Sequence, residues 1–476
     1  MTVTQPLARA VPSRSRALAL LLAGLVPLAV LVVGAGRTPV QPAVAVLLPG
    51  YALAALAVRR HPRAGVVIGT AFAIATPIYY GRYAIGTLAI TPVITAALLL
   101  LPLALSRRHL VRLGALDLAV GVFVLLRVVS LLLNYATGVG AVGGLLLGVA
   151  LPYVVLRLLT ARADPALLAG VVVAAGAALS VVAIGERTGQ GNPFFTWLPA
   201  TYQPELAHPS LRLGVVRAEG SFGDPIGFGM FLALALVLGV CLAVTGRTAS
   251  RRVACLAADG LILYGLTATQ SRGALLVAVV GITGWLVLTR RLAVLRLGVL
   301  VAAVAVVAVT TPALNTVLAL ADSSTGDTRE SRSASYRLEI LDVVRDPNTY
   351  SLLGQRTEDT GGVTLSVSSR VGLKSLDSEF ALLYFASGVL GALAFTAIVV
   401  LVLRVGAMRG LHPLERAWVV GVGASYLNLL TVALFTQEAG LLWGWTALTA
   451  SVAQRVAHQR SQAPRDHEER LTRWTP

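Results

Sequence analysis

The segment IGFGMFLALALVLGVCLAV, residues Ile226–Val244, contains no charged side chain and is long enough to cross a bilayer as a helix, which takes ~20 residues. Directly before it stands RAEGSFGDP, Arg217–Pro225, which carries charges of both signs, two glycines and a proline suited to the first turn of a helix. A guanidinium at such a junction can meet an anion without full desolvation. We therefore expect Arg217–Pro225 to form part of an anion site at the end of a membrane helix.

The rest of the chain continues this pattern of apolar runs separated by short basic segments. Of its 476 residues, 56% are hydrophobic and 13% are charged. This composition predicts an all-α, polytopic transmembrane bundle of about 12–14 helices. The net charge of +17 would suggest nucleic acid in a soluble protein. Here the arginines cluster between apolar runs, as in cytoplasmic loops, so the expected partner is the lipid bilayer and not nucleic acid.

The apolar runs divide the chain into membrane segments and loops. The expected spans are Ala17–Gly36, Ala43–Val58, Ala64–Tyr80, Leu88–Leu105, Ala115–Asn134, Val142–Thr160, Ala166–Ile184, Pro225–Thr245, Val253–Thr269, Gly273–Leu288, Leu297–Thr311, Glu379–Leu403, Arg416–Phe435 and Gly440–Val452. They form three groups, in residues 1–184, 225–311 and 379–455, followed by a basic tail in 456–476.

Arginines in alternate connections predict the orientation. Most of the 39 basic residues fall in one set of connections and in the tail, whereas the short loops of the other set hold only Arg37, Arg82 and Arg272. Basic residues are enriched on the cytoplasmic side of membrane proteins. We expect a multi-pass protein of the cytoplasmic (inner) membrane with both termini inside.

Two connections on the expected outer side are much longer than the others. Residues 185–224 are rich in aromatic residues and proline, which favours a folded cap, and residues 312–378 form the second long extracytoplasmic loop. Within the second loop, Ser335–Asp346 alternates charged and apolar residues at near-helical spacing and is stopped by Pro347. This pattern predicts a short amphipathic helix on the outer surface.

Three outer arginines are candidates for binding an anion. Arg272 lies in a tight turn between two spans that has no structural need for arginine, although it could instead extend to the lipid surface. Arg217 could instead form a salt bridge to Glu219 or Asp224 that organises its loop. Arg337 belongs to the amphipathic helix, where solvated or lipid-bound arginines are common.

Two further arginines are weaker candidates for substrate binding. Arg127 lies inside an apolar span and should face a polar cavity or pair with a carboxylate such as Asp224 or Glu438. Arg345 lies near the end of the amphipathic helix.

Asp377 and Glu379 are the candidate catalytic bases. They stand just before the apolar run Phe380–Val402, and a carboxylate partly withdrawn from water can take a proton near neutral pH. The alternative is structural, with Asp377 or Ser378 capping the helix and Glu379 in its first turn.

Four outer segments together resemble the O-antigen polymerase and O-antigen ligase family of bacterial membrane glycosyltransferases. The matching segments are Arg217–Pro225 with the apolar run that follows, Thr269-Gln270-Ser271-Arg272-Gly273-Ala274, Tyr336-Arg337 through Pro347 to Leu353-Gly354, and Asp377-Ser378-Glu379-Phe380 leading to Gly388-Val389-Leu390-Gly391. The resemblance covers roughly Val216–Val402.

The resemblance implies a C-type glycosyltransferase-like fold and an extracytoplasmic active site. The donor would be an undecaprenyl-diphosphate-linked glycan, held by Arg217, Arg272 and Arg337, and the acceptor a glycan or lipid. Arginines can stabilise a diphosphate leaving group in place of a divalent ion, so neither a metal nor a soluble cofactor is required. A separate regulator of chain length is a further expected partner.

The sequence just before the late helix differs from the pattern of this family's ligases. Ligases of this family place a histidine just before the late helix, whereas this chain has Leu376-Asp377-Ser378-Glu379. The difference favours polymerisation over ligation. The alternative from another class is a secondary transporter or flippase for an anionic solute or a lipid-linked glycan, with Arg127 and the outer arginines along its path.

Overall fold

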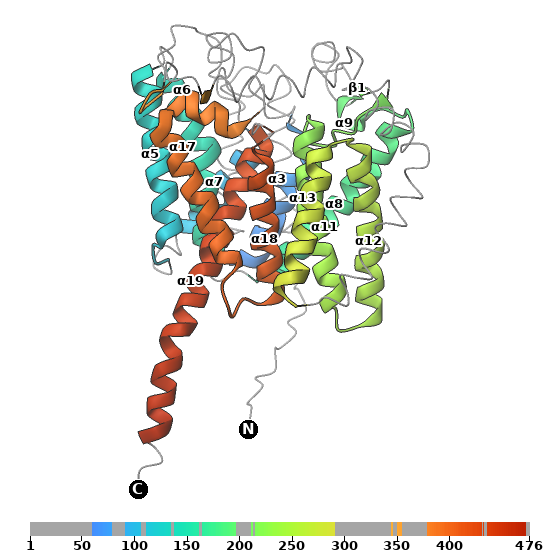
Figure 1. The fold of residues 1–476 in the computed structure, drawn as a ribbon. Helices are drawn as coiled ribbons and strands as arrows, with labels where there is room; N and C mark the ends of the chain where they lie inside the picture. Colours follow the sequence, from blue (N-terminus) through green and yellow to red (C-terminus); the bar gives the residue numbers. More distant parts are fainter. Residues whose placement is uncertain are drawn as a thin grey trace.

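The structure is a computed structural model that describes residues 60–78, 91–105, 111–134, 138–160, 164–196, 211–212, 215–290, 344–345, 350–354, 378–430, 432 and 436–472. This part of the chain is mostly helical (Figure 1). Its elements are α3 (Pro62–Ala75), α4 (Pro92–Leu105), α5 (Ala115–Asn134), α6 (Gly138–Leu145), the π-helical turn η3 (Leu146–Ala150), α7 (Leu151–Thr160), α8 (Pro165–Arg187), α9 (Pro193–Thr196), β1 (Leu211–Arg212), β2 (Val215–Val216), α11 (Pro225–Thr245), α12 (Ala249–Ala268), α13 (Arg272–Leu288), α17 (Glu379–Gly406), α18 (Pro413–Asn428) and α19 (Thr436–Thr472).

Helix α11 is the centre of the bundle. It is apolar on every side, and almost all of its side chains are buried against α8, α12, α13, α18 and α19. A helix without a polar face must be surrounded by other helices or lipid. The segment Pro225–Thr245 is therefore the helix around which the neighbouring helices pack, as well as a membrane-spanning segment.

Among the residues that the structure describes, five helices are long and apolar enough to cross a membrane. They are the helices at Ala115–Asn134, Ala141–Thr160, Pro165–Arg187, Pro225–Thr245 and Glu379–Gly406. Large apolar side chains also cover outward faces, as on α5, where Leu118, Leu125 and Leu133 are exposed. Such faces suit contact with lipid and not with water. The prediction of a mostly helical protein with membrane-spanning helices is therefore confirmed.

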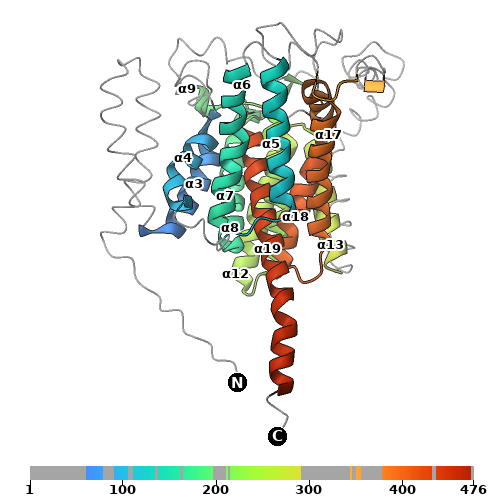
Figure 2. The same cartoon turned by 90° about the vertical axis from the view of Figure 1, so that its left-hand side faces the viewer.

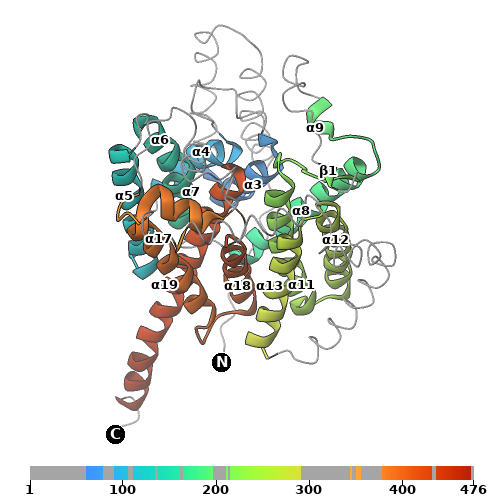
Figure 3. The same ribbon diagram turned by 45° about the horizontal axis from the view of Figure 1, so that its top comes forward.

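The bundle has two distinct ends (Figures 1 and 2). At the loop end, α8, α12 and α18 finish and α11, α13, α17 and α19 begin. At the tail end, α11 finishes, α12 and α18 begin, and α19 projects beyond the other helices. Viewed toward the loop end, α8, α11, α12 and α13 lie on one side of the bundle and α5 and α17 on the other (Figure 3).

Several predicted spans agree with the structure and some do not. The helices at Ala115–Asn134 and Pro225–Thr245 have the predicted bounds. Helix α18 ends at Asn428, short of Phe435, and α19 continues as a helix through the predicted tail to Thr472. The predicted spans Ala17–Gly36, Ala43–Val58 and Leu297–Thr311 lie outside the described residues.

Helix α17 is broken at Gly388, where the sequence predicted one continuous span. Gly388 has φ 70° and ψ −172°, a conformation open almost only to glycine. Beyond the break, the amides of Val389 and Leu390 donate to the carbonyl oxygens of Ser351 and Leu352 at 2.9 and 3.2 Å. A distant segment thus supplies the acceptors that the first half of the helix would have offered.

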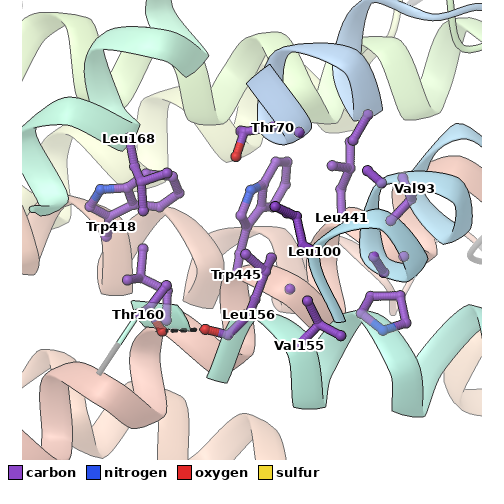
Figure 4. A pocket seen from close by; sticks show the side chains of 18 residues that line it. Thr70, Val93, Leu100, Val155, Leu156, Thr160, Leu168, Trp418, Leu441 and Trp445 are labelled. Atoms are coloured by element: carbon purple, nitrogen blue, oxygen red, sulfur yellow. Dashed lines mark hydrogen bonds between the residues drawn. The ribbon is translucent and has the colours of Figure 1, made fainter. Parts of the chain in front are cut away.

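An apolar cavity of about 50 Å³ lies among α3, α4, α7, α18 and α19 (Figure 4). Trp418 and Trp445 line it, and the Thr160 hydroxyl at its edge donates to the Leu156 carbonyl oxygen at 2.6 Å. A volume of this size holds only a few waters. It is therefore a gap in the packing and not a substrate site.

Candidate functional site

Arg217 connects the first long loop to the end of α12. Its Nε donates to the carbonyl oxygen of Thr269 at 2.9 Å, and the amide of Ala218 donates to the carbonyl oxygen of Ala268 at 3.0 Å. Arg217 is half-buried, whereas Ala218 is fully buried. The loop therefore reaches the turn that leads to Arg272.

That turn, Thr269–Ser271, is tightly organised. Gln270 has φ 51°, and the Thr269 hydroxyl donates to the carbonyl oxygen of Leu266 at 2.7 Å. Ser271 caps α13 by accepting a hydrogen bond from the amide of Ala274 at 3.4 Å. Arg272 follows as the first residue of α13 and is exposed. Two arginines selected from distant parts of the sequence are thus brought to the same turn.

The position of Arg272 is electrostatically unusual. The N-terminus of a helix carries a partial positive charge, so a cation in the first turn is disfavoured and an anion is favoured. Arg217 adds a second guanidinium at the neighbouring turn. A bound anion would therefore be stabilised by both arginines and by the start of α13.

A carboxylate that the sequence analysis did not select holds the loop in place. Glu186, buried in the last turn of α8, accepts hydrogen bonds from the amides of Glu219 and Gly220 at 2.8 and 2.9 Å. Asn192 donates to the Gly220 carbonyl oxygen at 2.9 Å. The Ser221 hydroxyl donates to the carbonyl oxygen of Ile74 in α3 at 2.7 Å. Residues 219–221 of the loop are therefore fixed to the bundle.

Asp224 closes the loop and begins α11. Its carboxylate accepts a hydrogen bond from the amide of Gly227 at 2.7 Å, which caps the helix. Burial raises the pKa of Asp224, and the Gly227 amide and the charge of Arg217 offset part of that rise. Arg217 thus acts on Asp224 as well as on the turn at Thr269.

Glu379 is the first residue of α17 and lies at the same end of the bundle as Arg217 and Arg272. Its amide donates to the carbonyl oxygens of Leu429 and Val432, both at 3.1 Å, which joins the start of α17 to the end of α18. The neighbouring Asn428 packs its side chain against Gly273, next to Arg272. Glu379 is only 9% exposed. Contacts therefore run continuously from Arg217 through Arg272 to the start of α17.

Ser378 and Glu438 complete the polar groups of this region. Ser378 caps α17 by accepting from the amide of Ala381 at 3.4 Å, one of the two capping alternatives offered by the sequence. Glu438, in the first turn of α19, is buried with its carboxylate against Gly227 of α11. Two buried carboxylates, Glu379 and Glu438, therefore lie at the starts of α17 and α19, at the same end of the bundle as the two arginines.

Arg127 is placed elsewhere, at the break in α17. Its Nη1 donates to the Ser387 hydroxyl at 2.6 Å. On the same face of α5, Ser130 donates to the carbonyl oxygen of Ala386 at 2.5 Å, and Asn134 to that of Leu353 at 2.7 Å. The sequence analysis expected a polar cavity or a carboxylate such as Asp224 or Glu438 beside Arg127; the structure gives this guanidinium a hydrogen bond to the hydroxyl of Ser387.

Three candidates from the sequence remain, Arg337, Arg345 and Asp377. Arg337 and Asp377 lie outside the described residues. Arg345 belongs to the short helical fragment Val344–Arg345 and is exposed. In the part of the chain that the structure describes, no group of three His, Cys, Asp or Glu side chains is arranged to hold a metal ion.

Comparison with protein-family models and with curated proteins found no match to this chain. A function for this chain is therefore inferred from the arrangement of its residues.

Proposed function

We propose that the protein is an integral-membrane glycosyltransferase that polymerises or ligates a polyprenyl-diphosphate-linked oligosaccharide on the outer side of the cytoplasmic membrane. The observation that carries this proposal is the meeting of Arg217 and Arg272 at the turn Thr269–Ser271. Paired guanidinium groups at a membrane boundary suit a diphosphate, because each can form two parallel hydrogen bonds to its oxygens.

In the proposed reaction, a hydroxyl oxygen of the acceptor forms a bond to the anomeric carbon of the donor. The bond from that carbon to the diphosphate oxygen breaks, and the polyprenyl diphosphate leaves with the electron pair. Arg217 and Arg272 stabilise the charge that develops on the leaving group. Glu379, or Asp377, accepts the proton of the acceptor hydroxyl, and Arg337 completes the diphosphate site.

The experiment is to reconstitute the full chain with a lipid-linked oligosaccharide and to measure both product length and consumed precursor. Arg272→Ala should abolish transfer at normal protein level. Arg404→Ala, an exposed arginine at the tail end, serves as the control. Unchanged transfer by Arg272→Ala would exclude the proposed diphosphate site.

One observation favours transport as the second candidate function. Asp259 lies within α12, is 7% exposed, and neither carboxylate oxygen has a hydrogen-bond partner in the described residues. An acidic group inside the membrane is characteristic of transport pathways. Asp259→Asn should stop movement of an anionic solute or lipid-linked glycan into vesicles if transport is the function, and should leave glycan transfer intact if it is not.

A further inference from the structure

A basic pocket lies at the tail end of the bundle, opposite the candidate transfer site. Its volume is about 600 Å³. It lies where α11 ends and α12 and α18 begin, beside the first turn of α8. Its described lining includes three arginines, Arg247, Arg251 and Arg252, and two buried leucines, Leu242 and Leu414.

Three arginines of this lining come from one short connection. Arg247 stands in the turn after α11, and Arg251 and Arg252 stand in the first turn of α12; all three are exposed. Arg252 also folds back on the turn, since its Nε donates to the carbonyl oxygen of Gly246 at 2.8 Å. Like Arg272, the latter two place positive charge at a helix N-terminus, where an anion is favoured.

The acidic residues nearest in sequence to the lining residues, Glu415 and Asp164, already form other hydrogen bonds or salt bridges. Glu415 accepts from the amide of His412 at 3.1 Å and forms a salt bridge with Arg455 at 2.9 Å. Asp164 accepts from the amide of Ala166 at 2.9 Å and thereby caps α8. Among the described residues, the lining contains no Asp or Glu. The positive charge of the pocket is therefore not balanced by its own walls.

The other walls are apolar. Leu242 and Leu414 are nearly fully buried at 6% and 3% exposure, and Ala166, Val244 and Pro413 extend the same surface. The pocket lies at helix ends, which is the depth of lipid headgroups for helices that cross a bilayer. Its ligand should therefore combine an anionic head with an apolar portion.

We propose that this pocket binds the phosphate group of an anionic phospholipid. Arginine forms bidentate hydrogen bonds to phosphate oxygens, and basic pockets between transmembrane helices are suited to lipid headgroups. The volume accommodates a headgroup and part of its glycerol, whereas free phosphate would leave the apolar walls unused. The proposal does not depend on the glycosyltransferase function.

The test uses the full chain purified in detergent, with binding followed by native mass spectrometry and by the shift in thermal unfolding. Phosphatidylglycerol should bind and stabilise the protein, whereas phosphatidylcholine should not. Arg247→Gln with Arg251→Gln should weaken phosphatidylglycerol binding by at least roughly tenfold, the loss expected for a charge-assisted hydrogen bond. Arg404→Gln with Arg409→Gln removes two exposed arginines outside the pocket and should retain binding.

Two further measurements complete the test. One distinguishes a lipid phosphate from free phosphate, and the other uses a milder variant that is expected to fold. Inorganic phosphate at lipid-matched concentration should neither bind nor compete; equal binding would overturn the assignment to a lipid. Arg247→Gln alone changes only an exposed turn residue and should weaken binding in a protein that folds. Equal affinity of this variant and the native protein, or equal binding of the two lipids, would refute the proposal.

Discussion

The Nε of Arg217 lies 2.9 Å from the carbonyl oxygen of Thr269, three residues before Arg272. This hydrogen bond fixes one guanidinium beside the turn from which the second one emerges. The atom of Arg217 that holds the turn is therefore Nε. The two roles of Arg217, holding the turn and binding an anion, can be separated experimentally.

Arg217→Lys should lower glycan transfer by roughly 10- to 100-fold without unfolding the protein. Lysine keeps the charge but cannot donate to Thr269 and present a planar fork to a diphosphate at the same time. The expected loss corresponds to one charge-assisted hydrogen bond. Initial rates with a lipid-linked oligosaccharide would measure it.

The matched control for this change is Arg187→Lys. Arg187 also bonds to the loop, donating from the last turn of α8 to the Val216 carbonyl oxygen at 3.3 Å. Its substitution should reduce transfer far less. Equal losses in the two variants would mean that Arg217 only holds the loop.

Glu186→Gln should loosen the first long loop. The carboxylate accepts from two amides, whereas a glutamine amide offers one oxygen and turns its NH2 toward the second amide donor. Leaving that buried donor unsatisfied costs about 1–3 kcal/mol. Limited proteolysis of reconstituted protein should show faster cleavage within residues 185–224. Gln190→Ala, an exposed change nearby, should cleave like the native protein.

The helices could be predicted from sequence because apolar length and flanking charge are local signals. Pro225–Thr245 shows both and has the predicted bounds. Glu186 also had a local signal, since an acidic residue in the last turn opposes the helix dipole and so points to a role outside the helix.

The contact between Arg217 and Thr269 and the break in α17 at Gly388 both depend on non-local contacts. The approach of Arg217 to Thr269 results from packing between α11 and α12, which no spacing in the sequence specifies. The break at Gly388 requires residues 351–352 to supply acceptors, and the apolar run Glu379–Leu403 gives no sign of them. Side-chain burial, as at Glu379, likewise depends on tertiary structure.

The buried pair Asp117–Arg157 should matter more for stability than the partly exposed pair Glu415–Arg455. Arg157 Nε lies 2.8 Å from Asp117 Oδ1, and the side chains are 4% and 5% exposed. Arg157→Met would leave a buried carboxylate without its partner, which costs about 3–5 kcal/mol.

The comparison variant is Arg455→Met, whose side chain is 27% exposed and whose pair with Glu415 is 2.9 Å long. Water can replace that partner, so the expected loss is at most about 1 kcal/mol. Reversible unfolding in mixed micelles would measure both variants. Similar losses would show that burial does not govern these pairs.

Gly388→Ala should disrupt the break in α17. At φ 70° and ψ −172° an alanine is strained, and its Cβ would also collide with the backbone of Ser351 and Leu352. The strain alone costs about 1–3 kcal/mol. Because the two backbone segments cannot separate without breaking the hydrogen bonds to Val389 and Leu390, we expect segment 350–354 to detach from α17.

The control is Gly260→Ala in α12, where an added Cβ meets no atom within 4 Å. That change should be neutral or stabilise the helix by up to about 1 kcal/mol, since alanine favours the helix over glycine. Thermal unfolding of the two variants, with a cysteine cross-link between Ser351→Cys and Val389→Cys, would report stability and docking separately. If Gly388→Ala kept both the native melting temperature and the cross-link, the left-handed conformation would not be needed for the break, and another residue of α17 would have to absorb the change in helix direction.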